Sequence, residues 1–168
     1  RSGNGEGEMN GPSGIAFDSH DTVWVVDSMN HRVQSFSQIG EFQSGFGRQG
    51  TDDGDLEMPW GICIDKNDDI YIADWGNNRV QIYEPNGEII ASLYGDADDY
   101  SKAGLYVLNR DPESIKRVRQ NPDPMQYLAT FGRPTGITTT EDNRIIIADT
   151  RCRLQIYQKD NEYSEPPA

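Results

Sequence analysis

Three aspartates occupy matching places in three similar stretches of the chain, and a carboxylate can act as a general base or hold a metal ion. Asp27, Asp74 and Asp149 each end a β-branched run, and each lies thirteen residues after a glycine. Because the group recurs in every stretch, a structural role in capping a turn is favoured over catalysis. The arginines that can pair with these carboxylates, in the same stretch or in a neighbouring one, are Arg32, Arg79 and Arg153.

Three acidic runs, at 51–55, 65–69 and 95–99, carry the oxygen ligands that Ca²⁺ prefers. The run 65–69 matches the first half of an EF-hand loop. Its sixth position is Ile70 instead of glycine, however, and its twelfth is Gly76 instead of glutamate. The motif therefore fails, and we interpret the acidic runs as turns and solvated loops.

The other groups with catalytic potential are few. The chain has two histidines, His20 and His31, whereas a catalytic zinc site needs about three protein ligands. The sequence contains no nucleophile elbow, no zinc-protease helix motif and no phosphate-binding loop. Cys63 falls in a strand and is expected in the core, while Cys152 falls in a turn that is expected to be exposed. We therefore predict no catalytic residue, no metal site and no cofactor, in a protein that is not an enzyme.

The three tryptophans differ in their surroundings. Trp24 alternates within a strand and is expected in the core. Trp60 and Trp75 fall in loop positions, next to the glycine and the aspartate of the second stretch. An aromatic ring at such a place can anchor a partner or pack between neighbouring units, and both interpretations stay open.

Composition limits what the chain binds. Its 168 residues suit about one domain, and 28 acidic against 15 basic residues give a net charge of −13. This charge opposes binding to nucleic acid or anionic lipid wherever a local basic patch is missing. The longest apolar runs have four residues and the first ten residues contain no apolar segment, so neither membrane insertion nor a signal peptide is expected. The compartment stays unknown.

An internal repeat organises these residues. A Pro-x-Gly motif recurs at Gly14, Gly61 and Gly136, and each glycine opens a series of short β-branched and aromatic runs separated by Asn, Asp and Gly turns. The first two units each contain a fourth run, at 41–46 and 88–93. Four short antiparallel strands in about 45 residues correspond to one propeller blade.

The repeat resembles the NHL repeat. Residues 30–36, NHRVQSF, are close to the motif that gives that family its name, and residues 77–83 differ by an asparagine in place of the histidine. The third copy, 151–157, is one residue shorter after Asp149. The resemblance implies an all-β fold, a β-propeller portion of three four-stranded antiparallel blades with a short helical insertion. The expected parts are blade 1 at about 11–47, blade 2 at about 58–95, the insertion at 96–128, blade 3 at about 129–160 and a polar tail at 161–168.

The insertion 96–128 does not follow the repeat. Asp111 and Pro112 are typical of a helix start, and Asn121 and Pro122 of a helix end, so a helix is expected at 112–120. Loops that interrupt a regular scaffold often carry function, and the basic cluster of the chain lies here. The predicted partner-binding residues are Arg110, Ile115, Lys116, Arg117, Arg119, Trp60 and Trp75.

Three blades do not close a ring, and the repeat aligns so that the sequence starts within a unit. NHL-type propellers usually have about six blades. We expect closure by further blades, from upstream in the same chain or from a second copy, or by a protein partner, because the flat outer faces are apolar. The favoured function is a non-enzymatic scaffold that binds a protein or another macromolecule but not nucleic acid. The alternative is an enzyme of the propeller lyase or lactonase type with a metal in the central channel.

Overall fold

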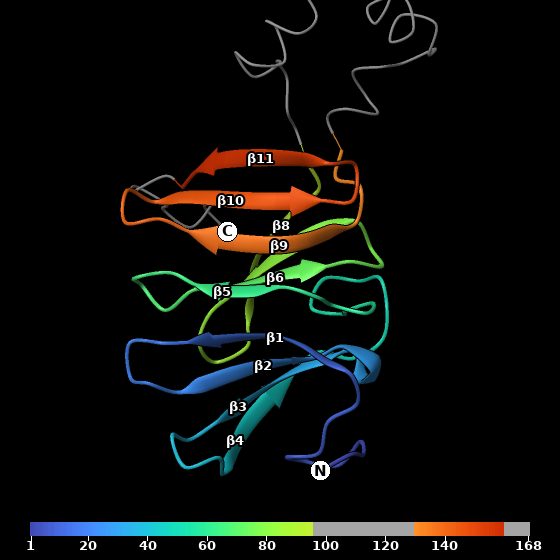
Figure 1. Ribbon diagram of the computed structural model, residues 1–168, viewed down its shortest axis with the longest axis vertical. Helices are drawn as coiled ribbons and strands as arrows, with labels where there is room; N and C mark the ends of the chain where they lie inside the picture. Colours follow the sequence, from blue (N-terminus) through green and yellow to red (C-terminus); the bar gives the residue numbers. More distant parts are fainter. Residues whose placement is uncertain (96–129, 160–168) are drawn as a thin grey trace, which may run out of the picture.

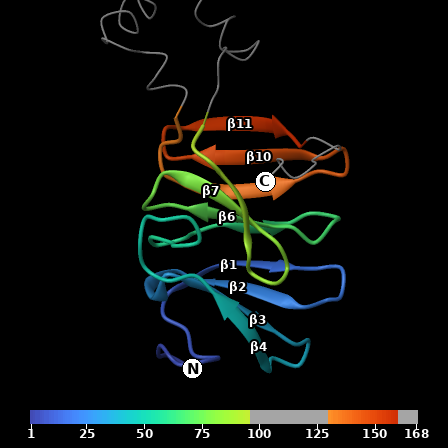
Figure 2. The same ribbon diagram turned by 180° about the vertical axis from the view of Figure 1, so that it is seen from behind.

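The computed structural model describes residues 1–95 and 130–159, which form three antiparallel sheets in chain order (Figure 1). Sheet 1 contains β1 (Pro12–Phe17), β2 (Val23–Asp27), β3 (Arg32–Phe36) and β4 (Phe42–Phe46), with the short 3-10 helix η1 (Ser28–Asn30) between β2 and β3. Sheet 2 contains β5 (Ile62–Ile64), β6 (Ile70–Asp74), β7 (Arg79–Tyr83) and β8 (Ile89–Leu93). Sheet 3 contains β9 (Pro134–Thr139), β10 (Arg144–Asp149) and β11 (Arg153–Gln158). Sheet 2 lies between the other two sheets in both views (Figures 1 and 2).

The prediction of an all-β antiparallel fold is confirmed, but the prediction of three four-stranded blades was wrong for the third sheet, which has three strands in the order β11-β10-β9. In sheets 1 and 2 a fourth strand pairs with the third, as Val33 with Phe46 and Val80 with Leu93. Among the described residues of sheet 3, no strand pairs with β11 in the way that β4 pairs with β3 and β8 with β7.

The turns of the three sheets share one backbone geometry. The turn after the first strand has a residue with positive φ at Asp21, Asp68 and Asn143, at 60°, 66° and 62°. Asn and Asp tolerate this left-handed conformation better than most residues, which explains their recurrence at this position. A second set, between the second and third strands, comprises His31, Asn78 and Cys152. The shorter third copy therefore keeps the turn of the other two.

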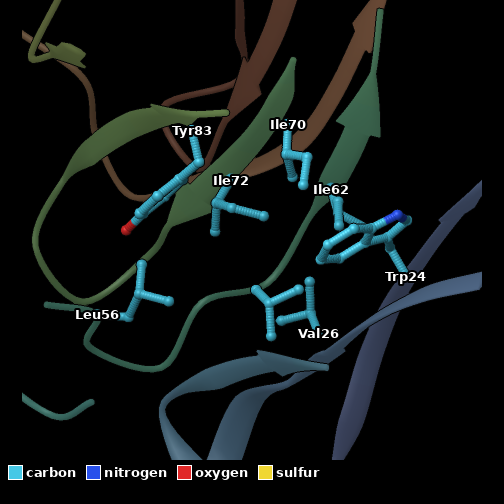
Figure 3. Packing of buried hydrophobic residues seen from close by; sticks show 8 residues of the cluster. Trp24, Val26, Leu56, Ile62, Ile70, Ile72 and Tyr83 are labelled. Atoms are coloured by element: carbon cyan, nitrogen blue, oxygen red, sulfur yellow. The ribbon is translucent and has the colours of Figure 1, made fainter. Parts of the chain in front are cut away.

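The core lies between consecutive sheets. Figure 3 shows the first cluster, in which side chains from sheets 1 and 2 point toward one another. Its members are Trp24, Val26, Val33, Leu56, Ile62, Ile70, Ile72 and Tyr83. The second cluster joins sheets 2 and 3 and contains Tyr71, Val80, Phe131, Ile145 and Ile147, with Cys63 packed against it. The predicted core positions of Trp24 and Cys63 agree with this packing.

The glycine that opens each unit allows the first strands of neighbouring sheets to approach closely. A Cβ atom on Gly14 would lie 2.8 Å from the carbonyl oxygen of Trp60, and one on Gly61 would lie 2.5 Å from that of Thr135. Real Cβ atoms do not come this close to a carbonyl oxygen, so these two positions require glycine. The Pro-x-Gly motif is therefore explained by contact between sheets.

Within the described ranges, no helix is long and apolar enough to cross a membrane. The predicted helix 112–120 and five of the predicted partner-binding residues lie outside the described residues. These five are Arg110, Ile115, Lys116, Arg117 and Arg119.

Candidate functional site

The repeated aspartates hold the loops of their own sheets in place. Asp74 is fully buried, and its carboxylate accepts hydrogen bonds from the Glu57 backbone N–H at 2.7 Å, from Asn77 at 2.8 Å and from the Arg79 Nε at 2.8 Å. Arg79 in turn donates to backbone carbonyl oxygens of the loop 51–55. A buried charge that is paired and hydrogen-bonded in this way is a structural element.

The same network recurs in sheet 1. Asp27 accepts hydrogen bonds from the Asn10 backbone N–H, Asn30 and Arg32, and Arg32 donates to the carbonyl oxygens of residues 5 and 8. Gln34 and Gln81, two residues after the arginines, each donate to a carbonyl oxygen of the same loops. The conserved spacing Asp-x4-Arg-x-Gln within these two units is therefore a clamp on the loop that precedes the sheet.

Asp149 of sheet 3 follows the pattern with a shorter turn. It accepts hydrogen bonds from the Gly132 backbone N–H at 3.0 Å and from Arg153 at 2.7 Å. Burial by itself raises the pKa of Asp149, but these hydrogen bonds and the Arg153 charge outweigh burial and hold that pKa below its ordinary value. The predicted pairing of each aspartate with an arginine is confirmed, and it occurs within the same sheet in all three cases.

Several loop residues that take no part in the Asp–Arg hydrogen-bond network lie on one side of the molecule. We call it the loop face, and it consists of the segments that precede the first strand of each sheet or join its second and third strands. These segments lie on one side because the start of the first strand pairs with the end of the second, as Pro12 does with Asp27 and Pro134 with Asp149. The loop-face residues that matter here are His31, Trp60, Trp75, Asn78 and Arg133.

Arg133 and Trp75 form the most distinctive contact of the loop face. The Arg133 guanidinium carbon lies 4.2 Å from the centre of the Trp75 ring, and the Arg133 backbone N–H donates to the Asn78 side chain at 3.1 Å. Arg133 is exposed and has no carboxylate within ion-pair distance among the described residues. A guanidinium stacked on indole keeps its N–H donors free for a ligand.

Trp75 and Trp60 therefore differ in role. Trp75 connects sheet 2 with sheet 3 through Arg133, as the packing interpretation of the sequence proposed. The backbone N–H of Trp60 donates a hydrogen bond to the carbonyl oxygen of Ala73. Trp60 is 47% exposed on the loop face. Arg133 was not singled out in the sequence, because the matching positions in the other units are Gly11 and Met58 and carry no charge.

His31 links sheets 1 and 2. Its Nδ1 atom accepts a hydrogen bond from the Met58 backbone N–H at 3.1 Å, so the ring proton of the neutral histidine is on Nε2. The Glu57 carboxylate lies 3.7 Å from the same nitrogen, too far for a hydrogen bond. Since its basic nitrogen is occupied by the backbone, His31 is a connecting residue and not a free base.

A cavity of about 710 Å³ lies on the opposite side, between sheets 2 and 3. Lys159 stands at its border and bridges Asp65 and Asp69, at 2.5 Å from each. Burial alone would raise the pKa of Asp65, but Lys159 and the other hydrogen-bond donors bring that pKa below its ordinary value. Burial raises the pKa of the nearby Cys63 thiol to about 12, so this cysteine stays protonated at neutral pH.

The described residues do not fit a metal centre. They contain no group of three or more His, Cys, Asp and Glu side chains that could hold a metal ion. The acidic run 65–69 instead forms a turn, in which Asp65 accepts hydrogen bonds from the backbone of Asn67 and Asp69. The fold therefore agrees with the alternative of a propeller lyase or lactonase, but the described residues do not supply the metal site that this alternative expected.

Solved structures with this fold include enzymes. A gluconolactonase from Xanthomonas campestris matches with a TM-score of 0.56 at 14% identity, over 89% of this chain and 38% of the other. A streptogramin B lyase matches with a TM-score of 0.50 at 16% identity, over 91% and 42%. Hydrazine synthase from Kuenenia stuttgartiensis gives a TM-score of 0.58 at 10% identity, over 94% and 35%. The chain thus spans about two fifths of the length of these proteins, and no curated protein sequence matches it.

These neighbours correct one prediction from the sequence. The prediction from the repeat that the protein is not an enzyme was wrong, because the propeller-type structures similar to this chain include a gluconolactonase and a streptogramin B lyase. The lack of a familiar catalytic motif does not argue against activity in such a fold, since propeller sites are assembled from loops of several blades.

The sequence comparison agrees with the repeat described above. The NHL repeat model matches residues 9–36 and 56–83, which contain the first three strands of sheets 1 and 2 and the loop clamps of both. The third unit has the same strand order and the same Asp–Arg pair. Residues 9–36 and 56–83 of the chain therefore match the NHL repeat, within a propeller-type fold.

Proposed function

We propose that the chain forms part of a propeller-type enzyme of the lyase or lactonase class and that its loop face binds the substrate. The fold shared with a gluconolactonase and a streptogramin B lyase supports the class. The observation that carries the site is Arg133, an exposed guanidinium stacked on Trp75 with no carboxylate partner among the described residues. In a chain of net charge −13, such a cation is a feature that favours an oxygen-rich or anionic ligand.

In lactone hydrolysis the Arg133 guanidinium can stabilise the negative charge that develops during the reaction. Water adds to the carbonyl carbon, the ring C–O bond breaks, and the ring oxygen takes up a proton, so a hydroxy acid is formed. Negative charge develops on the carbonyl oxygen during the addition, and a fixed guanidinium can stabilise it with two N–H donors. Trp75 fixes the guanidinium plane, and the half-exposed Trp60 offers an apolar surface for the ring of the substrate.

The test is an activity assay on the complete chain. Small aldonolactones are followed by release of acid, and streptogramin B is followed by loss of the intact compound. We expect turnover of at least one of them, and Arg133→Met should lower kcat/KM by roughly ten- to hundredfold, because a hydrogen bond from a charged donor contributes about 1.5–3 kcal/mol.

Arg144→Met is the matched control. Arg144 is an exposed arginine of sheet 3 at the opposite end of β10, paired with Asp142 at 2.9 Å. Its loss should leave kcat/KM unchanged. The proposal is contradicted if none of the substrates reacts, or if both arginine variants behave alike.

A further inference from the structure

The first and the last sheet each leave one apolar face uncovered. These two faces match the two halves of an interface that the molecule already forms twice. Each sheet has a forward face, which contacts the next sheet along the chain, and a rear face, which contacts the preceding sheet. The forward face of sheet 1 meets the rear face of sheet 2, and the forward face of sheet 2 meets the rear face of sheet 3 (Figure 1).

The two existing interfaces use the same repeat positions. In the first, Trp24 and Val33 of the forward face meet Ile62 and Ile72 of the rear face. In the second, Tyr71 and Val80 take the places of Trp24 and Val33. The rear-face partners there are Ile137 and Ile147, at the same distances from their opening glycine. The interface is therefore a property of the repeat and not of one pair of sheets.

The forward face of sheet 3 has no partner in the described structure. Leu154 pairs with Ala148 as Val80 pairs with Ala73, so Leu154 and Val80 are equivalent. Val80 is fully buried, whereas Leu154 is 68% exposed, and the neighbouring forward-face residue Ile156 is 57% exposed. Two large aliphatic side chains side by side on one sheet face form a patch of the kind that marks an interaction surface.

The rear face of sheet 1, at the other end of the molecule, is uncovered along β1, whereas Val25 and Phe36 on the same face are buried within the single copy. Ile15 and Phe17 of β1 occupy the positions of Ile62 and Ile64 in β5, relative to the opening glycines. Ile62 is buried and Ile64 is packed against the first core cluster, whereas Ile15 and Phe17 are each 60% exposed. One end of the molecule thus presents a forward face and the other end a rear face.

Gly136 provides an independent sign of the missing contact. Gly14 and Gly61 are each closed off by a carbonyl oxygen of the next sheet, that of Trp60 and that of Thr135. Gly136 is exposed, and a Cβ atom placed on it would meet only Ala148 of its own sheet, at 3.5 Å. Sheet 3 therefore keeps the glycine that a neighbouring first strand requires, although no such strand lies there in a single copy.

We propose that a second copy of this chain occupies both free faces, so that the forward face of sheet 3 in each copy packs on the rear face of sheet 1 in the other. The contact is heterologous, because a forward face meets a rear face. Two copies form this contact at both ends and so close a ring of six sheets. Rings of four to eight blades are typical of propellers. Complementarity supports this occupant, because sheet 1 of another copy presents the exposed rear-face residues Ile15 and Phe17.

The polar contacts of the existing interfaces place Cys152 at the new one. His31 accepts a hydrogen bond from the Met58 backbone N–H, and Asn78 accepts one from the Arg133 backbone N–H, in each case from the next sheet. Cys152 occupies the same turn position in sheet 3 and is exposed in a single copy. In the pair it should approach the segment around Gly11 of the second copy and become shielded.

The first measurement is the mass of the 168-residue chain in solution by light scattering after size exclusion. We expect twice 18.9 kDa. Because each copy carries a charge of −13, the experiment should be run at about 0.15 M salt or above to screen the repulsion. A single-copy mass at every concentration up to about 100 µM would overturn the proposal, since interfaces of this apolar kind are stable well below it.

The substitution Gly136→Ala distinguishes an effect on association of the two copies from an effect on folding of the single chain. Inside one copy the added methyl group meets Ala148 at ordinary contact distance, whereas in the pair it would collide with the carbonyl oxygen of Ser13. We expect the dissociation constant of the pair to rise at least tenfold while the far-UV spectrum of the separated chain stays unchanged. An unchanged dissociation constant would contradict the ring.

Mixing two charged variants tests the head-to-tail arrangement. Leu154→Glu damages the forward face and Phe17→Glu the rear face, so each variant alone has two damaged contacts per pair and should be monomeric. A mixture of the two retains one intact contact and should associate. If Leu154→Glu alone abolishes the pair while Phe17→Glu does not, two forward faces meet each other and the proposal is wrong.

Ile39→Glu is the control for the charged variants. Ile39 is 81% exposed in the turn between β3 and β4 and belongs to neither face, so this variant should remain a pair. Shielding of Cys152 gives a readout on the unmodified chain: its rate of reaction with a bulky maleimide should fall at least tenfold between the dilute and the associated protein. A rate that is independent of concentration would count against the pair.

Discussion

The interface between sheets 1 and 2 and the interface between sheets 2 and 3 use the same repeat positions, and a large cavity lies in the second. In the first, Phe46 at the end of β4 lies 4.5 Å from the Tyr83 ring and 6.1 Å from the Trp24 ring. In the second, the equivalent position at the end of β8 is Leu93, which lines the cavity of about 710 Å³. The repeat thus fixes which positions meet, while individual side chains decide whether the space between them is filled.

Truncation of these two equivalent residues should show the largest contrast. Phe46→Ala removes a half-buried aromatic ring from a three-ring stack and should lower the free energy of unfolding by about 2–4 kcal/mol. Leu93→Ala only enlarges an existing cavity and should cost about 1–2 kcal/mol. Urea unfolding of both variants measures the difference, and equal losses would show that the two interfaces are equally well packed.

Removal of the Lys159 charge should have the next largest effect, about 1–2 kcal/mol at neutral pH. Lys159 bonds to Asp65 and Asp69 beside the cavity, whereas in the first interface Asp68 accepts hydrogen bonds from Ser19. The folded-state pKa of Asp65 is lowered, so its contribution to stability is present above the unfolded-state value of about 3.8 and is lost as pH falls through the lowered pKa.

The pH profile of unfolding therefore distinguishes a charge effect from a packing effect. The difference in stability between the native chain and Lys159→Met should be full at pH 6–7 and should shrink as the pH falls through the carboxylate range. Lys66→Met is the control, because Lys66 borders the same cavity but is exposed. A difference that is constant down to pH 3 would mean that the lysine acts through its methylene groups.

Partial filling of the cavity should make the two interfaces more alike. Leu93→Phe places at the end of β8 the residue that β4 already has, and the cavity leaves room for the larger ring. We expect the free energy of unfolding to rise by about 1 kcal/mol, as is usual for cavity-filling changes. A loss of stability in thermal or urea unfolding would indicate that the cavity walls do not accept a ring in this orientation.

The sequence predicted the features that recur and missed those that occur once. The strands, the Asp–Arg pairs and the opening glycines were predictable because three copies can be compared, as for Asp27, Asp74 and Asp149. The Arg133–Trp75 stack joins a residue without counterparts in the other units to a tryptophan 58 positions away. A comparison of the fourth strands would have shown the smaller side chain at Leu93, but not the volume that it leaves.

The number of strands in sheet 3 and the function of the protein were missed for different reasons. A fourth strand was expected in the third unit from the resemblance, without a fourth run in its sequence, and the described residues of sheet 3 form three strands. Activity depends on which loops several blades bring together, and the repeat positions alone carry no information about those loops. Arg133 on the loop face is therefore a residue that only the three-dimensional arrangement could single out.

The smallest expected effect concerns two tyrosine hydroxyls at equivalent positions of the two interfaces. Tyr83 is buried against Phe46, and its hydroxyl has no hydrogen-bond partner in the part of the chain that the structure describes. Tyr157 takes the same place in sheet 3, beside the cavity, and its hydroxyl donates to the Gln155 side chain at 2.7 Å. A buried hydroxyl without a partner costs free energy, whereas a bonded one contributes about 0.5–1.5 kcal/mol.

Tyr83→Phe should therefore leave the free energy of unfolding unchanged or raise it by up to about 1 kcal/mol, and Tyr157→Phe should lower it by about 0.5–1 kcal/mol. Both substitutions keep the ring and its packing, so each is the control of the other. Opposite signs in paired urea titrations would show that the Tyr83 hydroxyl adds nothing to the stability of the tightly packed interface. The interface with the cavity would then depend in part on hydrogen bonds. If Tyr83→Phe is the more destabilising of the two, its hydroxyl has a partner in the folded protein, and this contrast between the interfaces is lost.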